Sequence, residues 1–195
     1  MTTEQAQQLL EQVRGMPLEA PVTIALATGI RLGELLALQW SDLDFKRDEP
    51  TMRIRRAKTK RGQRVIKLPP STVATMRAHR AAQNEIALAC GPAWTNADLV
   101  FPSEVGTTWD SANFRHRFQK ACLASGIVHL TPHELRHTSA SWLIIEGVPL
   151  KEIADMLGHA SITITADVYG HLFESSSRVA AVMEQMLAGP SARSA

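Results

Sequence analysis

The stretch Thr131-Pro132-His133-Glu134-Leu135-Arg136-His137-Thr138 combines three signals for the start of a helix. Thr131 is of a residue type that caps helix N-termini, a proline follows in the first turn, and Glu134 stands three residues after the cap, as in a capping box. We therefore predict a helix that begins here, runs to about Glu146 and stops at Gly147, because glycine readily takes the conformation that ends a helix.

This predicted helix carries side chains that could bind a ligand together. His133 and Arg136 are three positions apart, so both project from one face and can converge on an anion. The same stretch also fits the pattern H-E-x-x-H, in which His133 and His137 would bind zinc and Glu134 would act as general base. Zinc is the weaker interpretation, because the cationic Arg136 would lie close to the metal. It would also need a third protein ligand, for which the candidates are His159, Glu152 and Asp155.

Positive charge is concentrated in one segment of the chain. Ten of the 21 Lys and Arg lie between Lys46 and Lys67, whereas the first 30 residues hold one. Within this segment Met52 and Ile54 alternate with arginines, residues 60–63 have the composition of a turn, and residues 64–68 form a returning strand. The pattern predicts a basic antiparallel hairpin, which either meets a polyanion or is a solvated hairpin without a partner.

The rest of the sequence is mostly helical in its pattern, so we predict an α+β fold with one small antiparallel sheet. A short strand is also expected at Leu99–Phe101. The segments with helical spacing or helix-start signals are residues 3–13, an apolar stretch from Pro21 to Ala27 that Thr28-Gly29 interrupts, residues 31–38, a helix capped by Ser71 that reaches about Cys90, residues 111–124, residues 150–157 before Gly158, a short helix from Ser161 to Tyr169, and a final stripe from Val179 to Leu187.

Composition bounds the class of protein. The chain has 195 residues, 45% of them hydrophobic, which is enough for one domain with a sizeable core. No apolar run approaches the roughly 20 residues of a membrane span, and residues 1–14 are too polar for a signal peptide, so we expect a cytoplasmic protein. Cys90 and Cys122 form no metal-type cluster and are expected to be reduced.

Tyr169 is the single tyrosine of the chain. An ordinary half-buried tyrosine is one interpretation. The other is a nucleophile, because one phenol near a histidine and two arginines is what covalent phosphoryl transfer needs. A phenol has a pKa near ~10, so it attacks usefully only where its neighbours favour the phenolate.

Three short motifs, taken in order, resemble those of the tyrosine recombinases, the phage integrase family. The resemblance covers nearly the whole chain, and it rests on the order and spacing of the motifs rather than on any one of them. They are Thr28-Gly29-Ile30-Arg31-Leu32-Gly33-Glu34-Leu35-Leu36, the stretch from His133 to Thr138, and Leu157-Gly158-His159-Ala160-Ser161-Ile162 with Tyr169 ten residues after His159.

The resemblance implies a catalytic role for six residues, which are Arg31, Lys58, His133, Arg136, His159 and Tyr169. The two arginines would hold the scissile phosphate, the two histidines would hydrogen-bond to it or shuttle protons, and the tyrosine would attack. The lysine, on the hairpin, would protonate the leaving 5′ oxygen, with Lys60 as the alternative. Glu34 is expected to orient Arg31 as an ion-pair partner, and His137 and His171 are expected to be structural or close to DNA.

The function that follows is a site-specific DNA recombinase or integrase of a mobile element. It would cleave and rejoin strands through a 3′-phosphotyrosyl intermediate, without metal, ATP or cofactor. The implied partners are double-stranded DNA and further copies of the chain in a tetramer, with no membrane and no small-molecule substrate. The alternatives are a type IB topoisomerase, a DNA-binding regulator that does not cut and, least favoured, a zinc hydrolase.

We expect residues 1–195 to form a single catalytic domain, with a core of residues 1–172, a tail helix over residues 173–189 and a disordered end at residues 190–195. Most family members carry a separate helical domain before the catalytic one, and we expect it to be absent here. The tail helix would either fold back onto its own domain or dock on a neighbouring protomer.

Overall fold

A computed structural model describes residues 1–46, 48–55, 62–95, 97–128 and 130–170, together with residues 183, 184 and 187. These residues form a mostly helical α+β fold with one small antiparallel sheet, as predicted. The helices are α1 (Thr3–Val13), α2 (Glu19–Thr28), α3 (Leu32–Leu36), α4 (Pro70–Cys90), α5 (Ser111–Ala124), α6 (Pro132–Ile145), α7 (Leu150–Leu157) and α8 (Ile162–Tyr169); the strands are β1 (Leu43–Asp44), β2 (Thr51–Ile54) and β3 (Arg64–Lys67).

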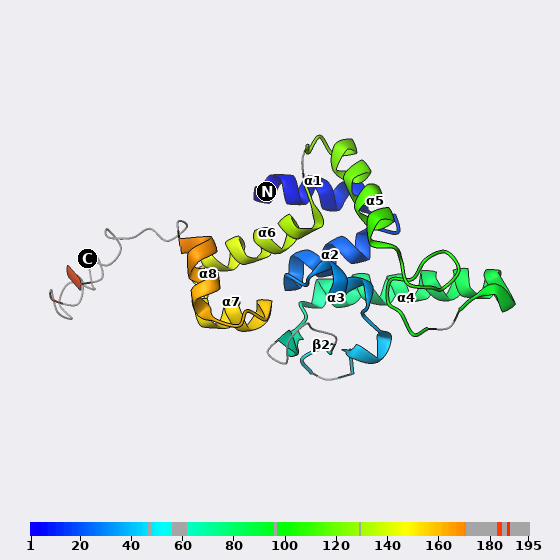
Figure 1. The fold of residues 1–195 in the computed structure, drawn as a ribbon, viewed down its shortest axis with the longest axis horizontal. Coiled ribbons are helices and arrows are strands. Elements are labelled where there is room, and N and C mark those ends of the chain that lie inside the picture. The colour runs from blue at the N-terminus through cyan, green and yellow to red at the C-terminus, as the bar shows by residue number, and fades with distance from the viewer. Residues whose placement is uncertain are drawn as a thin grey trace.

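Helix α2 lies in the middle of the molecule and packs against both α6 and α4 (Figure 1). It is apolar on every side, with Val22, Ile24 and Leu26 all buried, as expected for a helix that is surrounded by others. Helix α1 packs against α5, whereas α7 packs against α8 and also reaches α6 and strand β3. The end of α2 therefore lies near the elements that carry the second and third motifs.

The buried side chains form two clusters that meet along α6. The larger cluster takes in α1 to α5 and the sheet and includes Leu135 of α6. The smaller one joins α6, α7 and α8 and includes Ala140, Leu157 and Tyr169. Arg136 lies between Leu135 and Ala140 in the sequence of α6, so it is at the boundary between the two clusters.

The basic hairpin is present as predicted. Its strands pair in the order β1-β2-β3, all antiparallel, with Met52 opposite Ile66. Met52, Ile54 and Ile66 are buried, while Val65 on the other face is exposed. The connection between β2 and β3 includes Lys58 and Lys60, which lie outside the described residues.

Helix boundaries follow the sequence signals closely. Helix α6 begins after Thr131 and ends just before Gly147, α7 ends at Gly158 in the left-handed conformation, and Ser161 caps α8. The prediction of Ser71 as a cap was wrong, because α4 begins at Pro70, whose fixed φ angle suits the first helical turn.

Two further local predictions differ from the structure. The expected strand at Leu99–Phe101 is reduced to an isolated bridge between Leu99 and Gln39, and the two-residue strand β1 was not predicted. Of the expected tail helix, the structure describes Met183, Glu184 and Leu187, all helical, and the remainder lies outside the described residues. Cys90 and Cys122 are free thiols, as expected.

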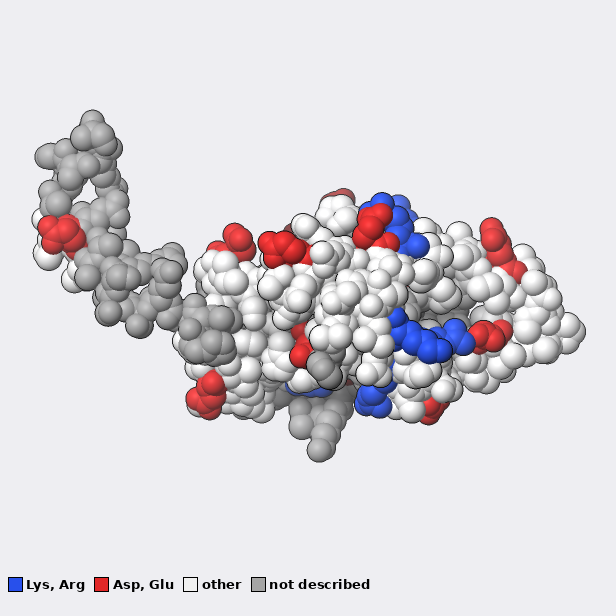
Figure 2. All heavy atoms as spheres, turned by 90° about the horizontal axis from the view of Figure 1, so that it is seen from above, with Lys and Arg blue, Asp and Glu red and all other residues white. Residues whose placement is uncertain are grey.

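Two surface properties of the described part bear on function. Its helices include none that is long and apolar enough to cross a membrane. Seen from above, acidic and basic side chains are scattered in small groups over the face in Figure 2, so that face has no patch of a single sign. The hairpin lies at the bottom of Figure 1, away from this view.

Candidate active site

A cleft of about 640 Å³ brings the three sequence motifs together. Five of the six predicted catalytic residues line it, which are Arg31, His133, Arg136, His159 and Tyr169. They come from the start of α3, from α6, from the turn between α7 and α8, and from the end of α8. The sixth, Lys58, lies outside the described residues.

Arg136 is the most deeply held of these side chains, with 3% of its surface exposed. Its Nη1 donates to the carbonyl of Gly29 at 2.6 Å and its Nη2 to the carbonyl of Leu157 at 2.8 Å. Both carbonyls belong to C-terminal ends of helices, α2 and α7, where the helix dipole favours a cation. Burial, together with Arg31 and Arg64, lowers the pKa of Arg136 to about 10, so it stays charged at neutral pH.

Gly29 also makes the close approach at this point possible. Its φ angle is +60°, and a Cβ there would lie 2.5 Å from Cδ2 of Leu157. A side chain at this position would therefore force the buried side chain of Leu157 to shift, and the left-handed backbone also favours glycine.

Arg31 is held in a different way, by a carboxylate. It precedes α3, its side chain is 40% exposed, and its Nη1 lies 3.0 Å from Oε1 of Glu34, which confirms the predicted ion pair. Its Nη2 donates to the carbonyl of Gly158 at 3.3 Å. The cleft thus has one buried arginine and one that is half exposed.

Glu34 binds a second arginine that sequence reasoning did not single out. Arg64, on β3, donates to both carboxylate oxygens of Glu34, at 2.9 Å and 3.3 Å. Burial by itself raises the pKa of Glu34, but the hydrogen bond and charge of Arg64, with those of Arg31, outweigh it and hold the pKa below its usual value. Nothing in the sequence distinguishes Arg64 from the other cations of the basic segment.

The histidines of the cleft are neutral at pH 7. Burial, then Arg136, Arg31 and Arg64, lowers the pKa of His159 to about 4, and its Nδ1 lies 2.8 Å from the hydroxyl of Thr165. Burial and neighbouring cationic groups also lower the pKa of His133. A neutral imidazole can donate from one nitrogen and accept at the other, so each can pass a proton.

Tyr169 is buried at the wall of the cleft, with 4% of its surface exposed. Its hydroxyl lies 2.7 Å from Nδ1 of His137. Burial raises the pKa of the phenol, and the charge of Arg136 offsets part of this effect. His137 was expected to lie outside the reaction, yet it contacts the candidate nucleophile. Its position one turn after His133, on the same helix face, was the available signal.

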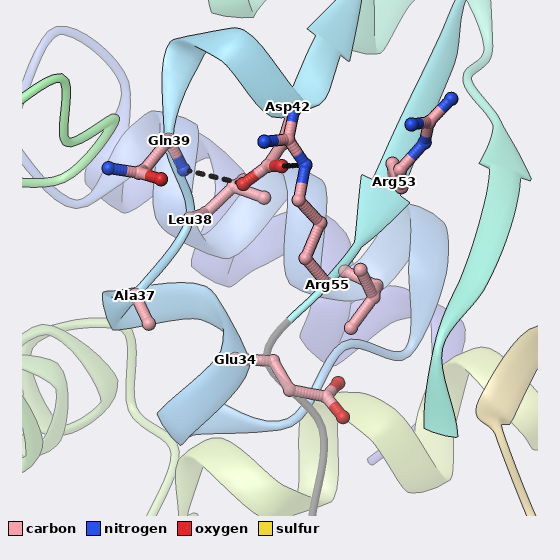
Figure 3. Close-up of a pocket in the computed structure, with 8 residues that line it drawn as sticks. Glu34, Ala37, Leu38, Gln39, Asp42, Arg53 and Arg55 are labelled. Atoms are coloured by element: carbon pink, nitrogen blue, oxygen red, sulfur yellow. Dashed lines mark hydrogen bonds and ion pairs between the residues drawn. The ribbon is translucent and has the colours of Figure 1, made fainter. Parts of the chain in front are cut away.

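A small second pocket of about 40 Å³ is also lined by Glu34 (Figure 3). There Asp42 holds Arg55, with Nε of the arginine 2.5 Å from Oδ1, and accepts a bond from the backbone of Gln39 at 3.1 Å. Arg55 also donates to the carbonyl of Ser41 at 2.7 Å. These bonds tie Arg55 to the short 3-10 helix Trp40–Asp42 that precedes β1, and Arg55 does not line the larger cleft.

The zinc interpretation gains no support from the described residues. Among them, no group of three or more His, Cys, Asp or Glu is placed to hold a metal ion. The carboxylate of Glu134, the proposed general base, instead accepts a hydrogen bond from the backbone of Thr131 at the start of α6. Nδ1 of His137 lies 2.7 Å from the hydroxyl of Tyr169, and its ring meets that of His133 edge to face, with the ring centres 4.7 Å apart.

The family model described as Phage integrase family matches residues 1–176. The chain belongs to this family. Among its relatives in the phage integrase family, a tyrosine recombinase XerC-like protein of Caldanaerobacter subterraneus subsp. tengcongensis is 32% identical over 194 residues, which cover 87% of this chain and 49% of that protein. An integrase of Streptomyces ambofaciens is 35% identical over 187 residues, covering 87% of this chain and 48% of the relative.

Solved structures agree with this membership of the phage integrase family. The crystal structure of XerA recombinase superimposes with a TM-score of 0.77 at 25% identity, over 94% of this chain and 62% of that one. A structure of the Tn1549 transposon integrase has the same fold, with a TM-score of 0.72 at 23% identity, over 95% of this chain and 66% of that chain. The chain spans about half the length of the curated relatives it matches.

Proposed function

We propose that this chain is the catalytic domain of a site-specific DNA recombinase that cleaves and rejoins DNA through a 3′-phosphotyrosyl link to Tyr169. The observation that carries the proposal is the cleft itself, which gathers two arginines and three histidines around the single tyrosine of the chain. The two curated relatives described above, a recombinase and an integrase by name, support the same reaction class.

The arginines suit a phosphodiester that is attacked in line. Negative charge grows on the non-bridging oxygens of the phosphate, and guanidinium groups stabilise it without a metal ion. The bonds described above use two of the five N–H groups of Arg136 and two of those of Arg31, so each side chain keeps donors for phosphate oxygens. The neutral His133 and His159 would add hydrogen bonds to the same phosphate.

The phenol must lose its proton as it attacks. His137 is the group in hydrogen-bond contact with it, and burial, together with Arg136, lowers the pKa of His137, so the ring is neutral and able to accept near pH 7. We therefore assign His137 the first acceptance of the Tyr169 proton. The attack forms the bond from phosphorus to the phenolic oxygen and breaks the bond to the 5′ oxygen.

The 5′ oxygen needs a proton as it leaves, and we assign this step to Lys58, with Lys60 as the alternative. Gly62 lines the cleft and Arg64 reaches Glu34 inside it, so the connection that contains both lysines ends at the edge of the cleft. Like charges in the basic segment would push the pKa of such a lysine downward, which suits a general acid.

The proposed substrate is double-stranded DNA, in the cytoplasm, with several copies of the chain assembled on it as a tetramer. The phosphotyrosyl ester keeps the energy of the broken bond, so a 5′ hydroxyl of another strand can reverse the step and no ATP is needed. The tail beyond α8 would either complete this domain or join neighbouring copies.

The test uses a pool of negatively supercoiled plasmids with random inserts. Covalent complexes are recovered under denaturing conditions, the attached DNA is sequenced, and the modified peptide is identified by mass spectrometry. We expect the adduct on Tyr169, and Tyr169→Phe should form none while its DNA affinity stays within about threefold, since only the nucleophilic oxygen is lost. Adduct in the Tyr169→Phe protein would contradict the assignment.

A synthetic duplex that carries a recovered sequence and a nick is the substrate for kinetic measurements. With a 5′ thiol as leaving group, which needs little protonation, cleavage by Lys58→Ala should be restored. Rescue of Lys60→Ala instead would move the acid to Lys60.

A further inference from the structure

Arg64 is a charged side chain that is 6% exposed, and such a group is costly to bury unless it is well paired. Its guanidinium donates to both oxygens of Glu34, at 2.9 Å and 3.3 Å. Its Nε donates to the carbonyl of Met156 at 2.5 Å and its Nη1 to that of Gly62 at 2.8 Å. One side chain on β3 therefore binds α3, the last turn of α7 and the end of the hairpin connection.

One of these partners and a neighbour of another also hold Arg31 of the cleft. Glu34 also pairs with Arg31, and Gly158, two residues after Met156, accepts a bond from Arg31. At Gly158 the backbone has a φ angle of +67°, and a Cβ would lie 2.9 Å from Nη1 of Arg64. The turn that leads to His159 is therefore packed directly against the guanidinium of Arg64.

We infer that Arg64 is a positioning residue for strand cleavage, and this inference rests on the proposed function. Its planar fork holds Glu34 and the end of α7 at a fixed separation, which keeps the guanidinium of Arg31 at the cleft. Arg64 also shares the negative charge of Glu34. Without it, Glu34 would pair with Arg31 alone and reduce the positive charge available to the phosphate.

The variant Arg64→Lys tests the positive charge of the side chain separately from its hydrogen-bonding geometry. Arg64→Lys keeps the positive charge but cannot reach both oxygens of Glu34 and two backbone carbonyls at once. We expect its single-turnover cleavage of the nicked duplex to slow by about tenfold or more, with DNA affinity within about threefold of the wild type. Arg14→Lys is the matched control, because Arg14 forms an exposed ion pair with Glu11 at 2.8 Å, and it should cleave at the wild-type rate.

The coupling to Glu34 is tested by a double-mutant cycle. If Arg64 acts through Glu34, the slowing by Glu34→Gln and by Arg64→Lys should not multiply in the double variant. Arg64→Gln combined with Glu34→Gln replaces the buried ion pair by two neutral side chains that can hydrogen-bond to each other. It should fold even if a single variant does not, and it too should cleave at least about tenfold slower, because Arg31 has lost its carboxylate partner.

The outcomes separate the two proposals. A wild-type protein that forms no adduct overturns both the recombinase function and the role of Arg64. If the wild type cleaves, three results overturn the role of Arg64 alone. They are full-rate cleavage by folded Arg64→Lys, full-rate cleavage by the neutral double variant, and effects that multiply in the double-mutant cycle. A loss of DNA affinity that accounts for the whole loss of rate also overturns it, because a positioning residue should change the rate constant of cleavage.

Discussion

Helices α3 and α6 both begin with a capping box, but the glutamate of that box has a different role in each helix. Arg31 and Thr131 both have extended backbone conformations before their helices, and in each case a glutamate three residues later accepts a bond from the backbone N–H of the capping residue. One arginine also lines the cleft at each place, Arg31 just before α3 and Arg136 within α6.

The difference lies in what each glutamate does beyond capping. Glu134 is partly buried, and its capping bond stays within its own helix start. Glu34 is 8% exposed and binds two arginines from different segments. The arginine of α6 is instead held by backbone carbonyls. The same capping pattern is thus a local helix signal in α6 and the centre of a long-range ionic network in α3.

The largest expected effect on strand cleavage comes from removing the two arginines. Arg31→Ala and Arg136→Ala should each slow adduct formation by about 10²-fold or more, because each stabilises the charge of the transition state. Arg136→Ala should also lower the free energy of unfolding by about 1–3 kcal/mol, since two carbonyls lose a buried donor, whereas Arg31→Ala should change it little. Adduct kinetics and urea unfolding measure both. Cleavage at full rate by either variant would remove that arginine from the site.

The next effect is on stability, and it separates the two glutamates. Glu34→Gln leaves the buried Arg64 without its charge partner and should cost about 3–5 kcal/mol of unfolding free energy. Glu134→Gln keeps a residue that suits a capping box and should cost less than about 1 kcal/mol. Urea unfolding of both variants makes the comparison directly. Equal losses would show that Glu34, like Glu134, is no more than a cap.

The smallest effect concerns pH. His159 has a pKa of about 4 in the folded protein, below the value of about 6.5 for an unfolded chain. The unfolded state therefore binds more protons between these values, and the free energy of unfolding should fall as the pH drops from about 6.5 to about 4. The contribution of Glu34 is fully present only above the pKa of 4.5 of an unfolded glutamate and begins to be lost below it, because its pKa in the folded protein is lowered.

Unfolding of the wild type and of His159→Asn between about pH 7 and about pH 4.5 checks this expectation. The variant keeps a polar group near Thr165 but cannot titrate. Part of the change of the unfolding free energy with pH should therefore disappear. The remainder belongs to other groups, including His133 and His137, whose pKa values are also lowered. An unchanged slope would mean that His159 is already protonated in the folded protein near pH 6.

Local chemistry explains why so many helix boundaries could be predicted. Thr131, Pro132 and Gly158 act within one turn of their own positions, and the structure places the ends of α6 and α7 beside them. Predictions that depended on distant partners were less complete. Leu99 bridges Gln39 and not a neighbouring strand of its own, a contact that no local pattern shows.

The sequence by itself determined which residues are available and how each motif begins its helix. The order of the three motifs pointed to the family, and it named five side chains that the structure brings to one cleft. Only the tertiary structure decided that His137 meets Tyr169, 32 residues away, and that Arg64 binds Glu34 and Met156, 30 and 92 residues away. The reason is physical, because a side chain's charge and shape are set by its own residue, whereas its partner is set by how the whole chain packs.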